Sequence, residues 1–363
     1  MHMENLKAKI EEKLRLDIDP YLGTDLITAG ALSAIDIDND SVTVIIEVGF
    51  PIKKYANSLK SRIERLLKEL SIDSITIEVS SKILSREVQK GTKPLKEVKN
   101  IIAVASGKGG VGKSTTTANL ALALQQEGCN VGVLDADIYG PSQTRMLATQ
   151  GRPESKDGKS MEPKLSYQLQ TMSIGNLVEE DTPMIWRGPM ATGALEQLIN
   201  DTNWSNLDYL IVDLPPGTGD IQLTLCQKIP VSGAIIVTTP QDIALLDARK
   251  GLKMFEKVNV PVLGIVENMS VHICSACGHV EHIFGEGGGD SMAKQYEVDM
   301  LGSLPLDMSI REGADNGRPT VAIDPDSKIA DSYREIARKV SARLSLRARD
   351  FSAKFPKIVI ENS

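Results

Sequence analysis

A short glycine-rich segment carries the residue types that bind the phosphate groups of a nucleotide. The segment reads Gly107-Lys108-Gly109-Gly110-Val111-Gly112-Lys113-Ser114. An apolar run at 101–105 precedes it, and a helical pattern at 115–127 follows it. Glycines let the backbone fold tightly so that its N–H groups point at phosphate oxygens, and the helix adds the positive end of its dipole. Lys113 can reach the outer phosphates, and the Ser114 hydroxyl can bind Mg²⁺. We therefore predict that this segment, together with Thr115, binds ATP.

Three aspartates follow apolar runs of the chain and are expected beside this loop. Asp135 and Asp137 follow the run at 131–134, and Asp213 ends the run at 209–212. Ligands of open parallel sheets bind at the carboxyl edge, which is where these side chains would lie. Asp213 has the position of an aspartate that organises Mg²⁺. Either of the first two aspartates could instead cap the next element, and this alternative is favoured more strongly for Asp135 than for Asp137.

A second group with ligand chemistry is the pair Cys274 and Cys277. Such a pair can be a redox dithiol, half of a zinc site, half of an iron–sulfur site or ordinary packing. One chain brings only two thiolates together here, but a two-fold axis between two chains would bring four. A zinc site within one chain could also use nearby histidines, namely His272, His279 and His282. The spacing between Cys277 and His279 is too short for a usual zinc site. The short spacing therefore favours iron–sulfur chemistry.

The elements that must position these residues form an α/β domain. Its apolar runs are short, uninterrupted and separated by helical stretches, as in a doubly wound, mostly parallel sheet covered by helices on both faces. The runs lie at 101–105, 131–134, 209–212, 234–237 and 262–266. We predict that this domain spans 100–347 and is followed by a tail at 348–363.

A small α+β domain is predicted at 1–84. Its helical patterns lie at 4–16 and 52–70, a hairpin pattern lies at 31–37 and 41–48, and a closing strand lies at 75–79. A Lys-rich, polar stretch follows at 85–99 and contains Gly91 and Pro94, which interrupt regular structure. Charged stretches of this kind are usually solvated, so we predict a solvated linker between the two domains.

Composition and charge exclude several classes of protein. The 363 residues are 41% hydrophobic and 25% charged, and the net charge is −7. We expect no nucleic-acid partner because there is no overall basic field, and no membrane partner because no run approaches the ~20 apolar residues of a spanning helix. Cys129 and Cys226 lie far from the cysteine pair and are expected to be buried as small hydrophobes. Few cysteines and no export signal indicate a cytoplasmic protein.

The additional lysine of the loop, Lys108, is not required by the general phosphate-binding pattern. With it, the loop resembles the deviant class found in dimerising ATPases, which includes partition, division-site and nitrogenase-iron-protein-like members. The resemblance implies that Lys108 contacts phosphates bound by the partner subunit, where a cation offsets developing charge only when the dimer closes. It also implies that Asp137 positions the attacking water.

The stretch from 100 to 343 resembles the Mrp/ApbC group of ATP-binding iron–sulfur cluster carriers. The resemblance rests on the loop, the cysteine pair and motifs at 135–142 (Asp-Ala-Asp-Ile-Tyr-Gly-Pro-Ser), 186–190, 214–220, 267–270 and 302–307. It implies a homodimer that holds a labile [4Fe–4S] cluster on Cys274 and Cys277 of both subunits. It further implies slow ATP hydrolysis, delivery of the cluster to apo iron–sulfur proteins, and contact with cluster-assembly scaffolds. Asn268 would face the nucleotide base.

The N-terminal domain resembles the iron–sulfur-assembly domain that is often fused in front of this ATPase. Asp19-Pro20 and Gly49-Phe50-Pro51 carry the resemblance. Related domains often have a cysteine near the second motif, whereas this chain has none before Cys129. Docking onto a partner or onto the ATPase domain is therefore favoured over metal handling.

Three other functions fit parts of the sequence. A partition or positioning ATPase would share the loop and its carboxylates, and some members end in a basic amphipathic helix that lies on lipid. The last helical pattern here, at 326–346, has an apolar stripe that we expect to pack on the sheet. A zinc-stabilised ATPase adaptor would use the cysteines structurally. An electron-transfer reductase would need cysteines well separated in sequence.

Overall fold

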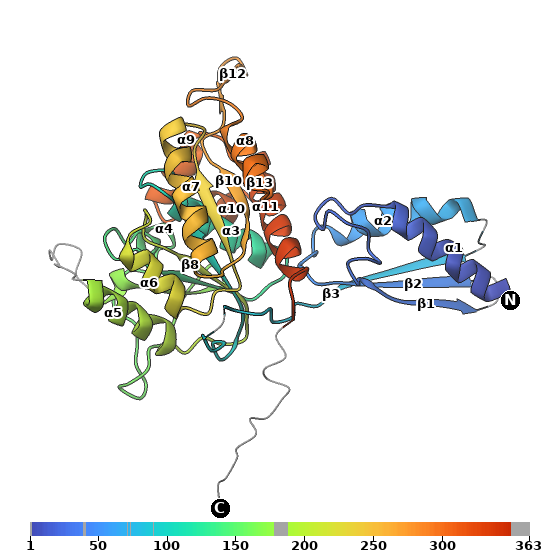
Figure 1. The fold of residues 1–363 in the computed structure, drawn as a ribbon, viewed down its shortest axis with the longest axis horizontal. Coiled ribbons are helices and arrows are strands. Elements are labelled where there is room, and N and C mark those ends of the chain that lie inside the picture. Colours follow the sequence, from blue (N-terminus) through green and yellow to red (C-terminus); the bar gives the residue numbers. More distant parts are fainter. Residues whose placement is uncertain are drawn as a thin grey trace, which may run out of the picture.

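The chain folds into two domains joined end to end, and Figure 1 shows the small N-terminal domain beside a larger domain built on a wide sheet. The structure is a computed structural model that describes residues 2–38, 41–70, 72, 74–89, 91–177 and 188–349. No helix in these ranges is long and apolar enough to cross a membrane.

The small domain is a three-stranded sheet with two helices (Figure 1). Its elements are α1 (His2–Leu16), β1 (Leu32–Asp38), β2 (Ser41–Val48), α2 (Ala56–Leu67), the 3-10 helix η1 (Lys68–Leu70) and β3 (Ser74–Ser81). The predicted hairpin is confirmed, since β1 pairs antiparallel with β2, and β3 then pairs parallel with β2. Leu59, Ile63 and Leu67 recur every four residues along α2, so they form one buried stripe of that helix.

The larger domain contains an eight-stranded sheet in the order β13-β10-β9-β4-β8-β5-β7-β6. Its strands are β4 (Val98–Ala105), β5 (Val131–Asp135), β6 (Lys164–Ser166), β7 (Leu169–Ser173), β8 (Leu207–Asp213), β9 (Gly233–Thr238), β10 (Val262–Glu267) and β13 (Met300–Ser303). All pairs are parallel except β6 with β7. All five apolar runs are strands, which confirms the predicted sheet. The sequence did not indicate β6, β7 and β13, which lie toward the two edges.

Helices cover both faces of this sheet, as expected for a doubly wound fold. They are α3 (Lys113–Gln126), α4 (Gln143–Met146), α5 (Gly188–Asn200), α6 (Asp220–Lys228), α7 (Asp242–Lys257), α8 (Gly288–Gln295), α9 (Met308–Asp315), α10 (Thr320–Ile323) and α11 (Lys328–Ser345), with a 3-10 helix η2 (Ile174–Asn176). One apolar core joins the sheet to α5, α6 and α7, and another joins it to α3 and α11. Tyr333, Ile336 and Val340 of α11 are buried in the second core, which confirms that the apolar stripe packs inside the domain.

The segment between the two domains differs from the predicted solvated linker. β4 begins at Val98, inside the predicted linker, and Arg86 and Gln89 are both buried. The Gln89 side-chain amide donates hydrogen bonds to the carbonyls of Cys226 and Ile229, each at 2.6 Å. The Cys226 carbonyl lies in the last turn of α6, where helix carbonyls lack partners within the helix, and Ile229 directly follows that helix, so the polar segment is held against the larger domain.

The two domains are joined by the carboxylate of Glu127, the residue that follows α3. Its Oε1 accepts a hydrogen bond from Arg338 Nε on α11 (3.0 Å), and its Oε2 accepts one from the backbone N–H of Lys54 (3.0 Å). The Arg338 guanidinium also lies 5.5 Å from the ring centroid of Tyr21. The backbone N–H groups of Lys53 and Lys54 both bond to Glu127, and α2 begins at Ala56, later than the predicted residue 52. The N-terminal domain therefore contacts the larger domain, which is one of the two dockings that the sequence favoured.

We expect Arg338→Ala to lower the free energy of unfolding by about 3 kcal/mol, since it leaves a buried carboxylate without its charged partner. The Glu127 side chain is 0% exposed, so in the folded protein its carboxylate relies on protein groups for its hydrogen bonds. Urea or thermal unfolding measures this effect. Lys54→Ala is the matched control because, among the described residues, its ammonium pairs with the exposed Asp326 alone, at 3.7 Å. This substitution should change stability by under about 0.5 kcal/mol. Wild-type stability of Arg338→Ala would contradict the role given to this pair.

Candidate nucleotide and cysteine sites

The glycine-rich loop connects β4 to α3 and packs tightly against two other elements. A Cβ added at Gly107 would lie 2.1 Å from the backbone of Asp247 on α7, and one added at Gly112 would lie 2.1 Å from Asn268 Nδ2. Gly112 also has a φ of +83°, which L side chains rarely adopt. Conformation and close approach therefore both require glycine, and the loop stands at the carboxyl edge of the sheet, as predicted.

Lys113, the first residue of α3, is buried among carboxylates. Its Nζ lies 2.5 Å from Asp213 Oδ1 and 3.5 Å from Asp137 Oδ2. Burial acts to lower the pKa of Lys113, but the charges of Asp213 and Asp137 outweigh it, so the pKa is raised. The Thr117 hydroxyl lies 3.2 Å from Asp213 Oδ1, and the Gln143 amide donates to Asp213 Oδ2 at 2.9 Å. Any ligand that binds the Lys113 ammonium must therefore displace these carboxylates.

Asp135, at the end of β5, holds the loop that follows this strand. Its Oδ2 accepts hydrogen bonds from the backbone N–H groups of Ser142 and Gln143 and from the Ser173 hydroxyl, each at 3.0 Å. Burial, followed by repulsion from Asp213, raises the pKa of Asp135 to about 7. Asp135 thus takes the capping role that was the alternative for it, whereas Asp137 faces Lys113.

The buried site around Lys113 contains more acidic than basic groups, and this excess of negative charge suits a divalent cation. Asp135, Asp137 and Asp213 share one buried lysine. Burial raises the pKa of Asp137 despite the nearby Lys113. Within the described part of the chain, some buried polar atoms of this region have no hydrogen-bond partner, among them Asp137 Oδ1, Ser142 Oγ and Gln143 Oε1. Carboxylate oxygens, free polar atoms and the adjacent Ser114 hydroxyl fit Mg²⁺, which prefers oxygen ligands and retained waters.

Sequence reasoning did not identify three polar residues of this site. Thr117, Gln143 and Ser173 bind the carboxylates of Asp135 and Asp213. Two of them had a usable signal, because Thr117 lies one helical turn after Lys113 and Gln143 directly follows the motif at 135–142. Ser173 had none, because it belongs to β7, which the sequence did not indicate.

Lys108 extends from the loop toward solvent. Its side chain is exposed, and no described residue pairs with its ammonium group. The Ser106 hydroxyl donates to its carbonyl oxygen at 2.9 Å, which fixes the backbone of the loop at this point. Lys108 lines a cavity of about 230 Å³ together with Thr239, Met269 and Phe284. An exposed cation at the rim of a phosphate loop is able to meet a group from outside its own chain.

The Asn268 side chain lies against the same loop, directly after β10. Its Nδ2 donates a hydrogen bond to the carbonyl oxygen of Val111 at 2.9 Å. The amide nitrogen therefore holds the loop in place. The expected contact of Asn268 with a nucleotide base stays a prediction.

Cys274 and Cys277 lie on a small hairpin that projects from the end of the larger domain, beside the label β12 in Figure 1. Its strands are β11 (His272–Ile273) and β12 (Val280–Glu281). The Gly278 N–H donates to the Cys274 carbonyl at 2.8 Å, and Gly278 has a φ of +72°, which favours glycine. Backbone N–H groups of Ala276 and Cys277 bond to the Cys274 sulfur and lower the pKa of its thiol. Cys274 is half-buried and Cys277 exposed.

Within one chain, the three nearby histidines do not complete a metal site with this pair. His272 Nδ1 lies 3.2 Å from a backbone oxygen, while His279 and His282 face glutamates at 3.9 and 3.7 Å. The described residues contain no group of three or more His, Cys, Asp and Glu side chains that could hold a metal ion. Cys129 and Cys226 are buried, as predicted. Trp186 and Arg187, from the motif at 186–190, lie outside the described residues.

Strand order, loop and carboxylates together define the class of protein. A glycine-rich loop runs from a central parallel strand into a helix, its lysine meets an aspartate at the end of the neighbouring strand, and helices cover both faces. This is the architecture of a P-loop NTPase.

Comparison with known proteins gives the family. The model described as "NUBPL iron-transfer P-loop NTPase" matches residues 97–341, and the model described as "Iron-sulfur cluster assembly protein" matches residues 7–79. The chain belongs to this family of iron-transfer P-loop NTPases.

Relatives support the same assignment along the chain. An iron-sulfur cluster carrier protein of Haemophilus influenzae is 52% identical over 347 residues, 94% of each chain. One of Pseudomonas fragi is 60% identical over 268 residues, 73% of this chain and 93% of that protein. A solved nucleotide-binding protein of Archaeoglobus fulgidus, in complex with ADP, is 34% identical with a TM-score of 0.56, covering 65% of this chain and 93% of that one.

Proposed function

We propose that this protein is a cytoplasmic carrier of iron–sulfur clusters that works as a homodimer. Two copies hold one [4Fe–4S] cluster on Cys274 and Cys277 of each chain, receive it from cluster-assembly scaffolds and deliver it to apo iron–sulfur proteins. ATP binding and hydrolysis accompany loading or release. The observation that carries the proposal is an accessible hairpin with two thiols on the same domain as a P-loop site.

The chemistry of the hairpin supports a transferable cluster. Iron–sulfur clusters are held by thiolates, and N–H groups bonded to the Cys274 sulfur favour its thiolate form. Cys277 is exposed, so thiolates of a recipient protein can reach the iron atoms. Transfer is then a ligand exchange in which each new iron–thiolate bond to the recipient replaces one to the carrier, with no net change in oxidation state. A site on two thiols per chain is complete only when a second chain contributes two more.

The surface around the hairpin supports a second copy as the partner. Ile273, Val280 and Ile283 each expose about half of their side chains on and beside the hairpin. The chain that follows the hairpin reaches the nucleotide site, because Phe284 lines the same cavity as Lys108. A second copy that covers the hairpin would therefore also approach Lys108. One interface then serves both the shared cluster and the lysine that acts on the partner's nucleotide.

The residues of the loop have distinct roles in the proposed hydrolysis. Backbone N–H groups of 107–115 and the Lys113 ammonium bind the phosphates, while Ser114 and Asp213 hold Mg²⁺. The bound ion would neutralise charge on the phosphate oxygens. Asp137 orients a water molecule whose oxygen bonds to the γ-phosphorus as the bond from this phosphorus to the bridging oxygen breaks. The products are ADP, inorganic phosphate and the proton that the water releases. Lys108 of the other chain offsets the negative charge that develops there.

Anaerobic reconstitution with iron and sulfide tests the proposal. We expect about four irons and four sulfides per dimer, and mass analysis under native conditions should give a dimer that contains one cluster. Zinc at one ion per chain, or no bound metal, would overturn the carrier function for the hairpin. Transfer is tested by incubating the loaded protein with an apo iron–sulfur enzyme and measuring the activity that the enzyme regains.

A further inference from the structure

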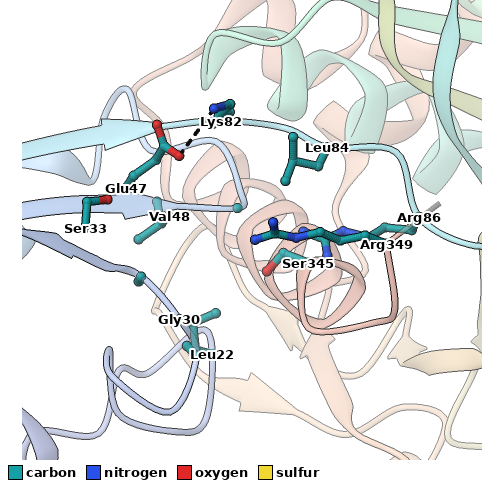
Figure 2. Close-up of a pocket in the computed structure, with 13 residues that line it drawn as sticks. Leu22, Gly30, Ser33, Glu47, Val48, Lys82, Leu84, Arg86, Ser345 and Arg349 are labelled. Carbon is teal, nitrogen blue, oxygen red and sulfur yellow. Dashed lines mark ion pairs between the residues drawn. The ribbon is translucent and has the colours of Figure 1, made fainter. Parts of the chain in front are cut away.

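A pocket of about 70 Å³ lies between the two domains, and its lining includes no residue of the nucleotide loop or the cysteine hairpin. Figure 2 shows Ser33, Glu47 and Val48 of the small domain on one side and Arg86, Arg349 and Ser345 on the other. One water molecule needs about 10–15 Å³ of the space that is open to its centre, so the pocket has room for a small ion.

Two arginines extend side by side into this pocket (Figure 2). Arg86 is only 6% exposed, and among the described residues its guanidinium donates a hydrogen bond to the carbonyl oxygen of Arg347 at 2.9 Å. No described carboxylate forms an ion pair with Arg86 or Arg349. Burial, and then the charge of Arg349, lowers the pKa of Arg86. A buried guanidinium is normally paired with an anion, so this arrangement lacks a partner within the described chain.

The backbone forces the two arginines together. Arg86 and Arg349 are opposite partners in an antiparallel β-bridge, and the Glu87 N–H donates to the carbonyl of Ala348 at 3.1 Å beside it. Side chains of directly opposite partners lie on the same face of such a pair, and like charges there are destabilising. An anion bound by both guanidiniums would attract each of them and so offset their mutual repulsion.

The remaining lining suits an anion with more than one oxygen. Glu47 is the one carboxylate of the lining, and Lys82 offsets it at 3.8 Å. Ser33 adds a hydroxyl from β1 (Figure 2). Gly49 keeps the space open, because a Cβ there would lie 2.9 Å from Ser345 Cβ and 3.2 Å from Arg86 Nη2.

We propose that this pocket is a binding site for a small oxyanion, a phosphate or carboxylate group, held by the guanidiniums of Arg86 and Arg349. Guanidinium groups match both kinds of oxyanion through paired N–H···O bonds. Because the pocket is lined by both domains, the bound anion strengthens the docking of the N-terminal domain onto the larger domain.

Calorimetric titration with inorganic phosphate tests the site in the full chain. Saturating Mg-ADP occupies the nucleotide loop, so that phosphate is kept away from it. The ionic strength is held constant throughout the titration. We expect one saturable site, at least tenfold weaker binding in Arg349→Gln, and unchanged binding in Arg347→Gln, whose side chain does not line this pocket. Arg349 is exposed, so its substitution should leave the fold intact, whereas Arg86→Gln serves as a second variant. Phosphate should also raise the melting temperature of the wild type more than that of Arg349→Gln.

Acetate distinguishes the two kinds of ligand. Displacement of phosphate by acetate, or saturable acetate binding alone, supports the oxyanion site with a carboxylate as the ligand. Absence of saturable binding for both probes overturns the proposal, as does equal phosphate affinity in the wild type and Arg349→Gln.

Discussion

Replacing Cys274 with alanine should abolish iron–sulfur cluster binding while leaving nucleotide affinity within about twofold of the wild type. The proposed cluster needs four thiolates, and the substitution removes two of them from a dimer because each chain carries it. Two remaining thiolates on exposed hairpins cannot complete tetrahedral iron sites, so bound iron should fall from about four atoms per dimer to nearly none. Iron and sulfide analysis after anaerobic reconstitution measures the loss, and titration with labelled ATP measures nucleotide affinity.

Two further variants make this result specific. Cys277→Ala should reproduce the loss, because both thiols belong to the same proposed ligand set. Cys129→Ala is the matched control, because this cysteine is buried in the core that includes α3, and burial raises the pKa of its thiol. Loss of ATP binding in Cys274→Ala would contradict the proposal and assign the pair a structural role. Iron retained at the wild-type amount would contradict it as well.

The nucleotide site could be predicted largely from the sequence because its determinants are local. A phosphate loop needs glycines at fixed spacing, and a buried parallel strand is continuously apolar, so both leave clear patterns. The position of Asp213 followed from the end of such a strand. The sequence favoured a capping role more for Asp135 than for Asp137, but the contact of Asp135 with Ser173 could not be predicted, because Ser173 belongs to β7, a strand without an apolar run.

Contacts between distant segments were less predictable. Glu127 and Arg338 are separated by 211 positions, and each alone has the pattern of an ordinary surface charge. Arg86 and Gln89 lie in a polar stretch that resembles a solvated connector, yet both are buried because the chain returns beside them at 347–349. A charged residue is buried when a distant partner reaches it, and a single sequence carries no signal for that pairing.

β10 links the two sites in a way that only the structure revealed. Asn268, directly after this strand, holds the phosphate loop through Val111, and Cys274 follows six residues later. Glu267, its last residue, accepts a hydrogen bond from the backbone N–H of Gly289, at the start of α8 beyond the hairpin. The segments before and after the cysteine hairpin are therefore both tied to the end of β10.

Lys108→Ala should reduce the rate of ATP hydrolysis by at least about 100-fold, the loss expected when one group that stabilises transition-state charge is removed. Nucleotide affinity should change by less than about threefold, because the exposed Lys108 side chain contacts none of the groups that surround Lys113 in its own chain. Steady-state hydrolysis measures the rate, and equilibrium binding of a nonhydrolysable analogue measures affinity. Lys250→Ala, at an exposed lysine on α7, should leave both quantities unchanged. An unchanged rate in Lys108→Ala would remove this lysine from the mechanism.

Mixing two inactive variants shows whether Lys108 acts on its own nucleotide or on the partner's. Lys108→Ala chains retain the loop lysine Lys113, whereas Lys113→Ala chains fail to bind the phosphates but still carry Lys108. If Lys108 acts across the interface, a mixed dimer has one complete site, made from the nucleotide of the first chain and the lysine of the second. At equal concentrations about half of the dimers are mixed, so about a quarter of the wild-type rate should return. No recovery, in a mixture shown to form mixed dimers, would mean that Lys108 serves the nucleotide of its own chain. The cysteine pair would then be the remaining support for an interface shared by two chains.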